Sequence, residues 1–311
     1  MNNRLIFIVF IIIIVAVILG YFIKSNVDKT SSFKQSAVGK VNITTSFYPL
    51  YFFTSEVVAD KGSVTNITPA GAEPHDYEPT TQDLARIEDS QLLVLNGGVE
   101  PWGDKIKDTL KDKPIVVLEA AEGLLTRQLT EDGEVVFLDP HIWLSPPLAK
   151  IEADKITQIM QKIDPQNMAY YTDRSSQLKL KLDELDMMYK QGLSSCQRRD
   201  IVTAHVAFGY LAEAYGLNQI AIAGLSPDEE PSPAKLAEVA QFVKVRQIKY
   251  IFFESLVSPK LAETIASETG TKTLVLNPLE GLTPEDLASG KNYLTVMKDN
   301  LANLKVALEC L

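Results

Sequence analysis

Two hydrophobic patterns alternate along the chain from Val41 onward. Short runs of β-branched and other apolar residues are followed by longer stretches in which apolar residues recur at helical spacing. This alternation is typical of strand–helix units that build a mainly parallel sheet. We therefore predict an α/β fold for the chain after residue 40.

In the first half, the short apolar runs predict strands at Val41–Thr44, Ser63–Ile67, Leu92–Leu95, Ile115–Leu118 and Glu134–Leu138. Helical spacing predicts helices at Leu50–Ala59, Thr81–Glu88, Trp102–Leu110 and Pro147–Ile163. We interpret residues 41–163 as one layered lobe.

The middle of the chain has a different pattern. Asp164 and Pro165 interrupt the helical spacing, and a long amphipathic run from Gln166 to Gln191 then contains no glycine or proline. At the rise of an α-helix, this run would extend for about 39 Å. We predict that residues 164–192 form one stiff helix linking two lobes.

After Gly192 the strand–helix alternation restarts, and we assign residues 193–311 to a second lobe. Its predicted strands are Asp200–Thr203, Gln219–Ala223, Lys249–Phe253 and Lys272–Leu276. Its predicted helices are Phe208–Tyr215, Pro233–Val245, Pro259–Glu268 and Asn292–Leu308.

The N-terminus carries a separate apolar run, from Leu5 to Ile23, which contains no charged residue. About 20 apolar residues are enough to cross a bilayer as a helix. The run is long for a cleaved signal, offers no good cleavage site, and lacks a lipoprotein cysteine after Gly20. We therefore expect an uncleaved signal anchor at 1–24, rather than a cleaved signal. Serine and lysine then predict a flexible tether at 25–40.

Charge and cysteine content restrict the partners and the compartment. The chain has 40 acidic against 30 basic residues and no basic cluster, so nucleic acid is not expected as a partner. Its two cysteines, Cys196 and Cys310, permit one disulfide outside the cytoplasm. Two free buried thiols are the alternative, and the sequence leaves both open.

Histidine occurs at only three positions, His75, His141 and His205, and each follows a predicted strand or the turn after one. The carboxyl ends of parallel strands share one edge of a sheet, where ligands bind in open α/β folds. A lone histidine there is most often an ordinary loop residue. Three together, with none elsewhere, favour a common metal site, and imidazole nitrogen suits Zn²⁺.

Several segments together resemble a known family. They are S-F-Y-P-L-Y-F-F from Ser46, P-A-G-A-E-P-H-D-Y-E-P-T from Pro69, D-P-H-I-W-L-S-P from Asp139, G-L-S-P-D-E-E-P-S-P from Gly224 and N-P-L-E-G-L-T-P-E-D from Asn277. In this order they resemble the metal-binding substrate-binding proteins of ABC importers, in particular the zinc-specific branch. The resemblance implies two (β/α)4-like lobes with mainly parallel sheets, joined by one long α-helix, with the metal between them.

The resemblance also implies the ligands. His75, His141 and His205 fall on the family's metal positions. Many relatives have an aspartate where this chain has Asn277, but Glu280 supplies a carboxylate in the same loop. An ionised carboxylate is a better zinc ligand than a neutral amide, so we favour Glu280 over Asn277 as the fourth ligand.

Further acids are candidates for holding a ligand imidazole through its second ring nitrogen, namely Asp76, Glu78 and Glu254. For Asp76 and Glu78 the alternative is an exposed loop acid. For Glu254, which ends a predicted strand, it is ordinary capping. The sequence does not choose between these interpretations.

The identity of the metal is less constrained than the ligands. The segment from Gly123 to Val135 has no histidine, whereas zinc importers often carry a histidine-rich insertion there and manganese-binding relatives do not. Three imidazoles and one carboxylate form a nitrogen-rich set, which favours Zn²⁺ over Mn²⁺. We therefore expect Zn²⁺ as the transported ligand, with Mn²⁺ as the alternative.

The resemblance implies an extracytoplasmic, membrane-tethered zinc receptor that works with a permease and, through it, a cytoplasmic ATPase. We expect a monomer with no catalytic activity. One alternative is a zinc hydrolase or lyase that uses three histidines and a bound water, which requires an open coordination position. Another is an adhesin or surface scaffold with a structural metal.

Overall fold

The computed structural model describes residues 39–131 and 134–311. The predicted anchor at 1–24 and nearly all of the predicted tether at 25–40 lie outside this range. Across the two described segments, no helix combines the length and the hydropathy that a bilayer crossing requires.

Four parallel strands form the first sheet, in the order β2–β1–β3–β4. They are β1 (Val41–Thr45), β2 (Gly62–Asn66), β3 (Leu92–Leu95) and β4 (Val116–Glu119). Between them lie α2 (Tyr48–Val58), α3 (Thr81–Glu88) and α4 (Gly103–Leu110). Each matches a predicted element to within two residues at either end. Every residue of β3 is buried, as expected for an inner strand of a parallel sheet.

The fifth predicted strand does not belong to this sheet. It is β6 (Glu134–Leu138), and it pairs antiparallel with β5 (Gln128–Glu131), a strand that the sequence analysis missed. Only two residues separate the strands. A parallel pair needs a crossover of about a dozen residues or more, so the short connection allows only a hairpin.

The second sheet repeats the topology of the first, in the order β8–β7–β9–β10. Its strands are β7 (Asp200–Thr203), β8 (Asn218–Ala221), β9 (Tyr250–Phe253) and β10 (Lys272–Val275). Its helices are α7 (Gly209–Tyr215), α8 (Pro233–Arg246), α9 (Lys260–Thr269), α10 (Pro284–Ala288) and α11 (Tyr293–Ala307). All the predicted elements are confirmed, and α10 is additional.

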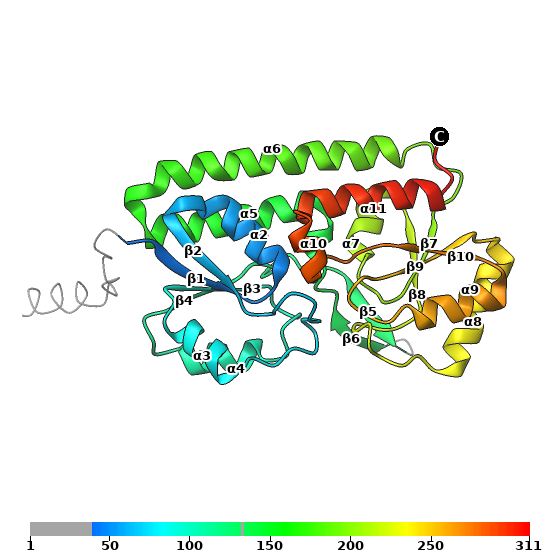
Figure 1. Ribbon diagram of the computed structural model, residues 1–311, viewed down its shortest axis with the longest axis horizontal. Helices are drawn as coiled ribbons and strands as arrows, with labels where there is room; N and C mark the ends of the chain where they lie inside the picture. The colour runs from blue at the N-terminus through cyan, green and yellow to red at the C-terminus, as the bar shows by residue number, and fades with distance from the viewer. Residues whose placement is uncertain (1–38, 132–133) are drawn as a thin grey trace, which may run out of the picture. The chain divides into compact units, whose positions relative to one another are not determined.

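Two long antiparallel helices connect the sheets. α5 (Pro146–Ile163) leads through a short 3₁₀ turn at Pro165–Asn167 into α6 (Met168–Gly192). The turn is fixed by Asp164, which accepts hydrogen bonds of 2.6 Å from both Asn167 and Tyr171. Figure 1 shows α6 lying beside α2 and α5 at one end and beside α11 at the other.

One hydrophobic core extends across both halves of this region. On α6, the Tyr189 ring stacks on Tyr215 at 4.9 Å, and its hydroxyl donates to the Met297 carbonyl oxygen at 2.7 Å. On α11, the Tyr293 ring packs edge-on against Phe53 of α2 at 4.8 Å. A change in the relative position of the sheets would therefore disturb buried aromatic packing.

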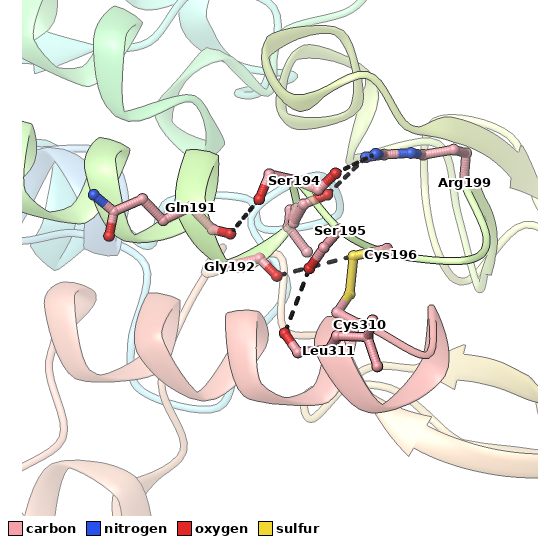
Figure 2. Close-up of a disulfide and its surroundings, with 9 residues drawn as sticks. Gln191, Gly192, Ser194, Ser195, Cys196, Arg199, Cys310 and Leu311 are labelled. Carbon is pink, nitrogen blue, oxygen red and sulfur yellow. Dashed lines mark hydrogen bonds between the residues drawn. A yellow bond between two sulfur atoms is a disulfide. The ribbon is translucent and has the colours of Figure 1, made fainter.

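Cys196 and Cys310 form a disulfide, so the alternative of two free thiols is wrong. The bridge joins the segment after α6 to the residues that follow α11 (Figure 2). Arg199 fixes the same segment, because its guanidinium donates to the carbonyl oxygens of Leu193 and Ser194.

Candidate metal centre

Four side chains from separate parts of the chain converge at one point. The candidate ligand atoms of His75, His141, His205 and Glu280 all lie within 4.8 Å of one another. The Glu280 Oε1 atom is 3.1 Å from the Nε2 atoms of His141 and His205. It is 3.3 Å from the Nε2 atom of His75. The structure thus brings together all four residues that the sequence analysis selected.

His75 reaches this point on the loop that follows β2. The loop turns at Gly71, whose φ of 84° suits glycine and is unfavourable for residues with a Cβ atom. The Gly71 amide donates a hydrogen bond of 3.0 Å to the carbonyl oxygen of Leu282, in the loop that carries Glu280. The loops of His75 and Glu280 are therefore linked through their backbones.

His141 arrives by a different route from the one predicted. It follows β6 of the hairpin and not a strand of the parallel sheet, and it leads directly into a 3₁₀ turn at Ile142–Leu144. Asp139 holds it twice, since Oδ1 lies 3.1 Å from the His141 backbone nitrogen and 2.8 Å from Nδ1. A carboxylate accepts but does not donate, so Nδ1 carries the proton and Nε2 is left for a metal.

His205 follows β7 and is fixed through its backbone and its ring. Its carbonyl oxygen accepts hydrogen bonds of 2.8 Å from the Thr203 hydroxyl and 2.9 Å from the Gln219 amide. Its Nδ1 atom contacts the carboxylate of Glu254, at the end of β9. Of the two roles considered for Glu254, holding a ring nitrogen or ordinary capping, the structure shows the contact with the ring.

The acids that hold the rings are Asp139 and Glu254, not those beside His75. Asp76 is exposed and accepts a hydrogen bond of 3.1 Å from Ser226, and Glu78 is also exposed. The sequence analysis missed the role of Asp139. The signal was its position two residues before a histidine in D-P-H, where a tight turn can bring the carboxylate back to the ring.

Asn277 builds the loop that presents Glu280. Its backbone amide donates to Asn300 Oδ1 at 2.8 Å, and its carbonyl oxygen accepts from Asn300 Nδ2 at 2.7 Å. Its own Oδ1 atom accepts from the Leu279 amide at 2.7 Å, where the chain takes a positive φ of 60°. The Asn277 side chain is thus engaged within the loop, which leaves Glu280 as the residue that enters the cluster.

The cluster is buried and electrostatically coupled. The side chains of His141, His205 and Glu280 are 0% exposed, and that of His75 is 5% exposed. Burial alone would lower the pKa of His141, but Asp139 and Glu280 outweigh it and raise this pKa. In the same way, Glu254 and Glu280 outweigh burial and raise the pKa of His205.

The carboxylate of Glu280 has the complementary shift. Burial alone would raise its pKa, but the charge of His205 and hydrogen bonds from the histidine rings hold this pKa well below its usual range. Glu280 is therefore ionised at neutral pH. In the metal-free protein its charge favours protons on the rings of His141 and His205, and a dication that replaced those protons would interact with the same negative charge.

Glu73 is a further acid that the sequence analysis did not select. Burial, followed by the charge of Glu280, raises its pKa to about 10. Glu73 is therefore protonated at neutral pH and adds no second negative charge beside the cluster. Its Oε1 atom accepts a hydrogen bond of 3.2 Å from the His75 backbone amide.

The donor set is suited to a zinc ion. Zn²⁺ prefers four ligands in a tetrahedron, drawn from imidazole nitrogen, thiolate and carboxylate. The cluster offers three imidazole nitrogens and one carboxylate. Four protein donors leave no coordination position for a reacting water, which favours a site that binds over a site that catalyses.

A cavity of about 660 Å³ borders the cluster on the side of His75. Its acidic lining residues are Asp76, Glu100, Asp104, Glu119, Asp228 and Glu229. Lys107 pairs with two of these acids, at 2.8 Å from Asp104 and 2.6 Å from Glu119, which leaves the lining with a net negative charge. A cleft in which one sign of charge predominates raises the local concentration of counter-ions. The approach to His75 is therefore favourable for a cation.

Comparison with known proteins gives a consistent set of relatives. Residues 43–307 match the family described as ZnuA, zinc-uptake complex component A, periplasmic. The chain is 41% identical over 292 residues to the high-affinity zinc uptake system protein ZnuA of Bacillus subtilis, covering 90% of this chain and 92% of that protein. It is also 41% identical over 283 residues to the zinc-binding lipoprotein AdcA of Streptococcus pneumoniae, covering 88% of this chain but only 56% of AdcA.

The fold has a solved counterpart. The Zn(II)-bound ZnuA-like domain of Streptococcus pneumoniae AdcA superposes with a TM-score of 0.76 at 42% identity. The match covers 87% of this chain and 100% of that domain. The chain therefore corresponds to the ZnuA-like part of the longer AdcA protein.

Proposed function

Since this chain belongs to the ZnuA family of zinc-uptake components, we propose that it binds Zn²⁺ outside the cytoplasm and delivers it to the permease of an ABC importer. A cytoplasmic ATPase would drive transport through that permease. The zinc ion is the cargo, and a receptor of this kind catalyses no reaction. The observation that carries the proposal is the buried convergence of three imidazoles and one carboxylate.

His75, His141, His205 and Glu280 are the proposed zinc ligands. Their support is the mutual approach of their donor atoms and the contacts of Asp139 and Glu254 with two of the rings. These contacts orient the imidazoles so that their Nε2 atoms face one point. The engagement of Asn277 within its own loop supports Glu280 as the fourth ligand.

The organisation of the chain follows from the same proposal. Residues 41–163 and 193–311 are the two lobes, and 164–192 is the linking segment, in which the helix itself begins at Met168 after the 3₁₀ turn. Residues 1–24 are the signal anchor and 25–40 the tether, which together hold the receptor at the outer face of the membrane. We propose that the receptor acts as a monomer.

Zinc is the proposed cargo rather than manganese. Manganese favours oxygen-rich sites, whereas three of the four donors here are nitrogen. The test is a competition titration of the metal-free chain with Zn²⁺ and Mn²⁺. We expect one bound Zn²⁺ per chain that excess Mn²⁺ does not displace. Displacement of zinc by equimolar Mn²⁺ would favour the manganese alternative.

A matched pair of variants tests the fourth ligand. Glu280→Gln replaces the buried carboxylate with an amide and should weaken zinc binding by about a hundredfold or more, given the poor affinity of Zn²⁺ for neutral amides. Glu78→Gln makes the same chemical change on an exposed acid three residues after His75 and should leave zinc affinity within about threefold. Equal affinity of Glu280→Gln and the wild type would remove Glu280 from the ligand set and reopen the hydrolase alternative.

A further inference from the structure

Arg127 joins the metal centre to the opposite half of the fold. It lies just before β5, and its Nε atom is 3.4 Å from Oδ2 of Asp139, the acid that holds His141. Its Nη1 atom donates a hydrogen bond of 2.9 Å to Glu213 on α7. The guanidinium of Arg127 thus contacts Asp139, which holds the proposed ligand His141, and also contacts Glu213 in the second half of the fold.

Asp139 depends on this cation. Its side chain is 0% exposed, and its Oδ1 atom is used twice by His141. Its Oδ2 atom accepts no hydrogen bond from any residue that the structure describes, and Arg127 approaches it within ion-pair distance but without hydrogen-bond geometry. A buried carboxylate is costly unless it is paired, so the charge of Arg127 stabilises Asp139 where it is.

The backbone around Arg127 is also attached to α7. The Tyr210 hydroxyl oxygen accepts hydrogen bonds from the amides of Thr126 at 3.0 Å and Arg127 at 3.2 Å. The Arg127 guanidinium lies 5.7 Å from the centre of the Tyr210 ring, within range of a cation–π contact. The position of Arg127 is therefore set by the second half of the fold and not by β5 alone.

Gly209, the first residue of α7, makes this arrangement possible. A Cβ atom at this position would lie 2.4 Å from Arg127 Nε and 2.5 Å from Asp139 Oδ2. Both distances are far below van der Waals contact. The absence of a side chain at Gly209 allows Arg127 and Asp139 to approach each other against the start of α7.

We propose that Arg127 is a positioning residue that couples α7 to His141 through Asp139, so that zinc affinity depends on how the two halves are seated. The inference rests on the proposed zinc site. A shift of α7 moves Tyr210 and Glu213, which withdraws Arg127 from Asp139 and releases the ring of His141. A permease that moved α7 would lower the affinity for zinc without touching a ligand.

A double-mutant cycle tests the coupling by measuring zinc affinity through competition with a chromogenic chelator. Asp139→Asn should weaken zinc binding about 10- to 100-fold, as expected for the partner of a ligand histidine, and Arg127→Gln about 3- to 10-fold. In the Asp139→Asn background, Arg127→Gln should add less than about twofold, because its effect passes through Asp139. Arg127→Lys should restore part of the loss, since lysine keeps the charge but not the fork.

Two further variants approach the same contact from α7. Gly209→Ala separates Arg127 from Asp139 without removing a charge, and Glu213→Gln removes the α7 partner of Arg127. Both should increase the zinc dissociation rate, and both should alter the visible spectrum of the Co²⁺-substituted protein, which reports on ligand geometry. Arg198→Gln, which breaks an arginine–carboxylate pair with Glu309, is the matched control and should change neither.

The outcomes separate this inference from the proposed function. If the wild-type chain binds no zinc, the proposed function fails. If the wild type binds zinc but Arg127→Gln has the same affinity, the inference alone is wrong. Fully additive effects of Arg127→Gln and Asp139→Asn would also overturn it, because Arg127 would then act by another route. Circular dichroism verifies that each variant is folded.

Discussion

At the scale of single residues, protons would compete with zinc for the buried histidines of the proposed site. The pKa values of His141 and His205 are raised above the ordinary histidine value of 6.5, because Glu280 and the acid behind each ring outweigh the effect of burial. A protonated imidazole cannot bind a metal. If these rings are the ligands we propose, zinc must displace protons from them near neutral pH.

We predict that zinc affinity rises as the pH rises from about 6 until the raised pKa values of the two rings are passed. Each proton that zinc displaces makes the affinity increase about tenfold per pH unit. Displacement of one or two protons therefore gives an increase in zinc affinity of about 10- to 100-fold per pH unit. Calorimetric titrations in two buffers of different ionisation enthalpy measure the number of protons released. A zinc affinity that is constant between pH 6 and pH 9 would contradict this prediction.

The stability of the metal-free protein should change in the opposite direction. A histidine whose pKa is higher in the folded state stabilises the fold fully below its unfolded value of 6.5, and this contribution is lost as the pH rises through the folded value. We predict that the increase in melting temperature caused by zinc grows with pH. Thermal scans with and without zinc at several pH values measure this increase in melting temperature. An increase that becomes smaller as the pH rises would contradict the raised pKa values of His141 and His205.

Glu152 on α5 gives a second prediction, which is independent of the metal. Its side chain is fully buried, and neither carboxylate oxygen has a hydrogen-bond partner among the residues described. Burial raises its pKa from 4.5 to about 8. Its contribution to stability is present below the unfolded value and is lost as the pH rises towards the folded value.

We therefore predict that Glu152→Gln, which does not titrate, gains stability relative to the wild type as the pH rises. Between pH 5 and pH 8 the gain should be about 3–4 kcal/mol, because the slope is about 1.4 kcal/mol per pH unit and is shallower near the unfolded and folded pKa values. Urea unfolding of both proteins at the two pH values measures the difference. If the free energies of unfolding of the wild type and Glu152→Gln changed with pH in parallel, the charged form of Glu152 would have to be stabilised by solvent or by a partner.

The sequence selected the four residues that converge in the candidate metal centre, but not all the contacts that hold them. Histidine is rare in this chain, so its three positions were conspicuous, and the family motif added Glu280. The roles of Asp139 and Arg127 depend on turns and on packing between distant segments. Neither feature leaves a periodic pattern in the sequence.

At the scale of elements, hydrophobic periodicity identified the strands of both sheets and all the helices except α10. α10 has only five residues, which is too short for helical spacing to be recognised. β5 was missed because Gln128–Glu131 is short and largely polar. Both missed elements lie close to loops that carry site residues, so periodicity was least informative near the site.

The disulfide is an element-scale constraint that gives a further prediction. It closes a loop of 114 residues between Cys196 and Cys310. A crosslink over a loop of this length stabilises the fold by about 3–5 kcal/mol, mainly by restricting the unfolded chain. The double variant Cys196→Ser, Cys310→Ser should lose about this much free energy of unfolding.

Zinc affinity of the double variant should stay within about threefold of the wild type, because no proposed ligand lies among the labelled neighbours of the bridge (Figure 2). Urea unfolding gives the stability, and wild-type protein with a reductant is the control. An unchanged free energy of unfolding would show that the bridge is not formed in solution. A large loss of zinc affinity would show that the bridge also fixes the site.

At the scale of the whole described region, the shared core limits movement between the two sheets. Tyr189 and Tyr293 pack against residues of both halves, and α6 contacts helices on either side. We predict that zinc binding changes the radius of gyration by less than about 1 Å, as for partners that are largely pre-organised. Small-angle scattering with and without zinc measures this, and a large compaction would contradict the rigid core.

The sequence predicted two similar layered halves and a helix between them, because each depends on local periodicity. The common core and the disulfide include contacts between residues more than a hundred positions apart. The strand order of each sheet depends on pairings between residues about 20 to 50 positions apart. The sequence pattern is compatible with these contacts but does not predict them. The cysteine pair is one example, since the sequence allows both a disulfide and two free thiols, and the fold brings the two sulfur atoms together.

The common core also bears on how the molecule is made. Residues of α2, α6 and α11 pack together in this core. A nascent chain that contains only the first sheet and its helices therefore has aromatic residues that are not yet covered. The fragment stays incomplete until α11, the last helix of the chain, is synthesised. A receptor that is kept unfolded until it has been exported does not form this incomplete intermediate on the ribosome.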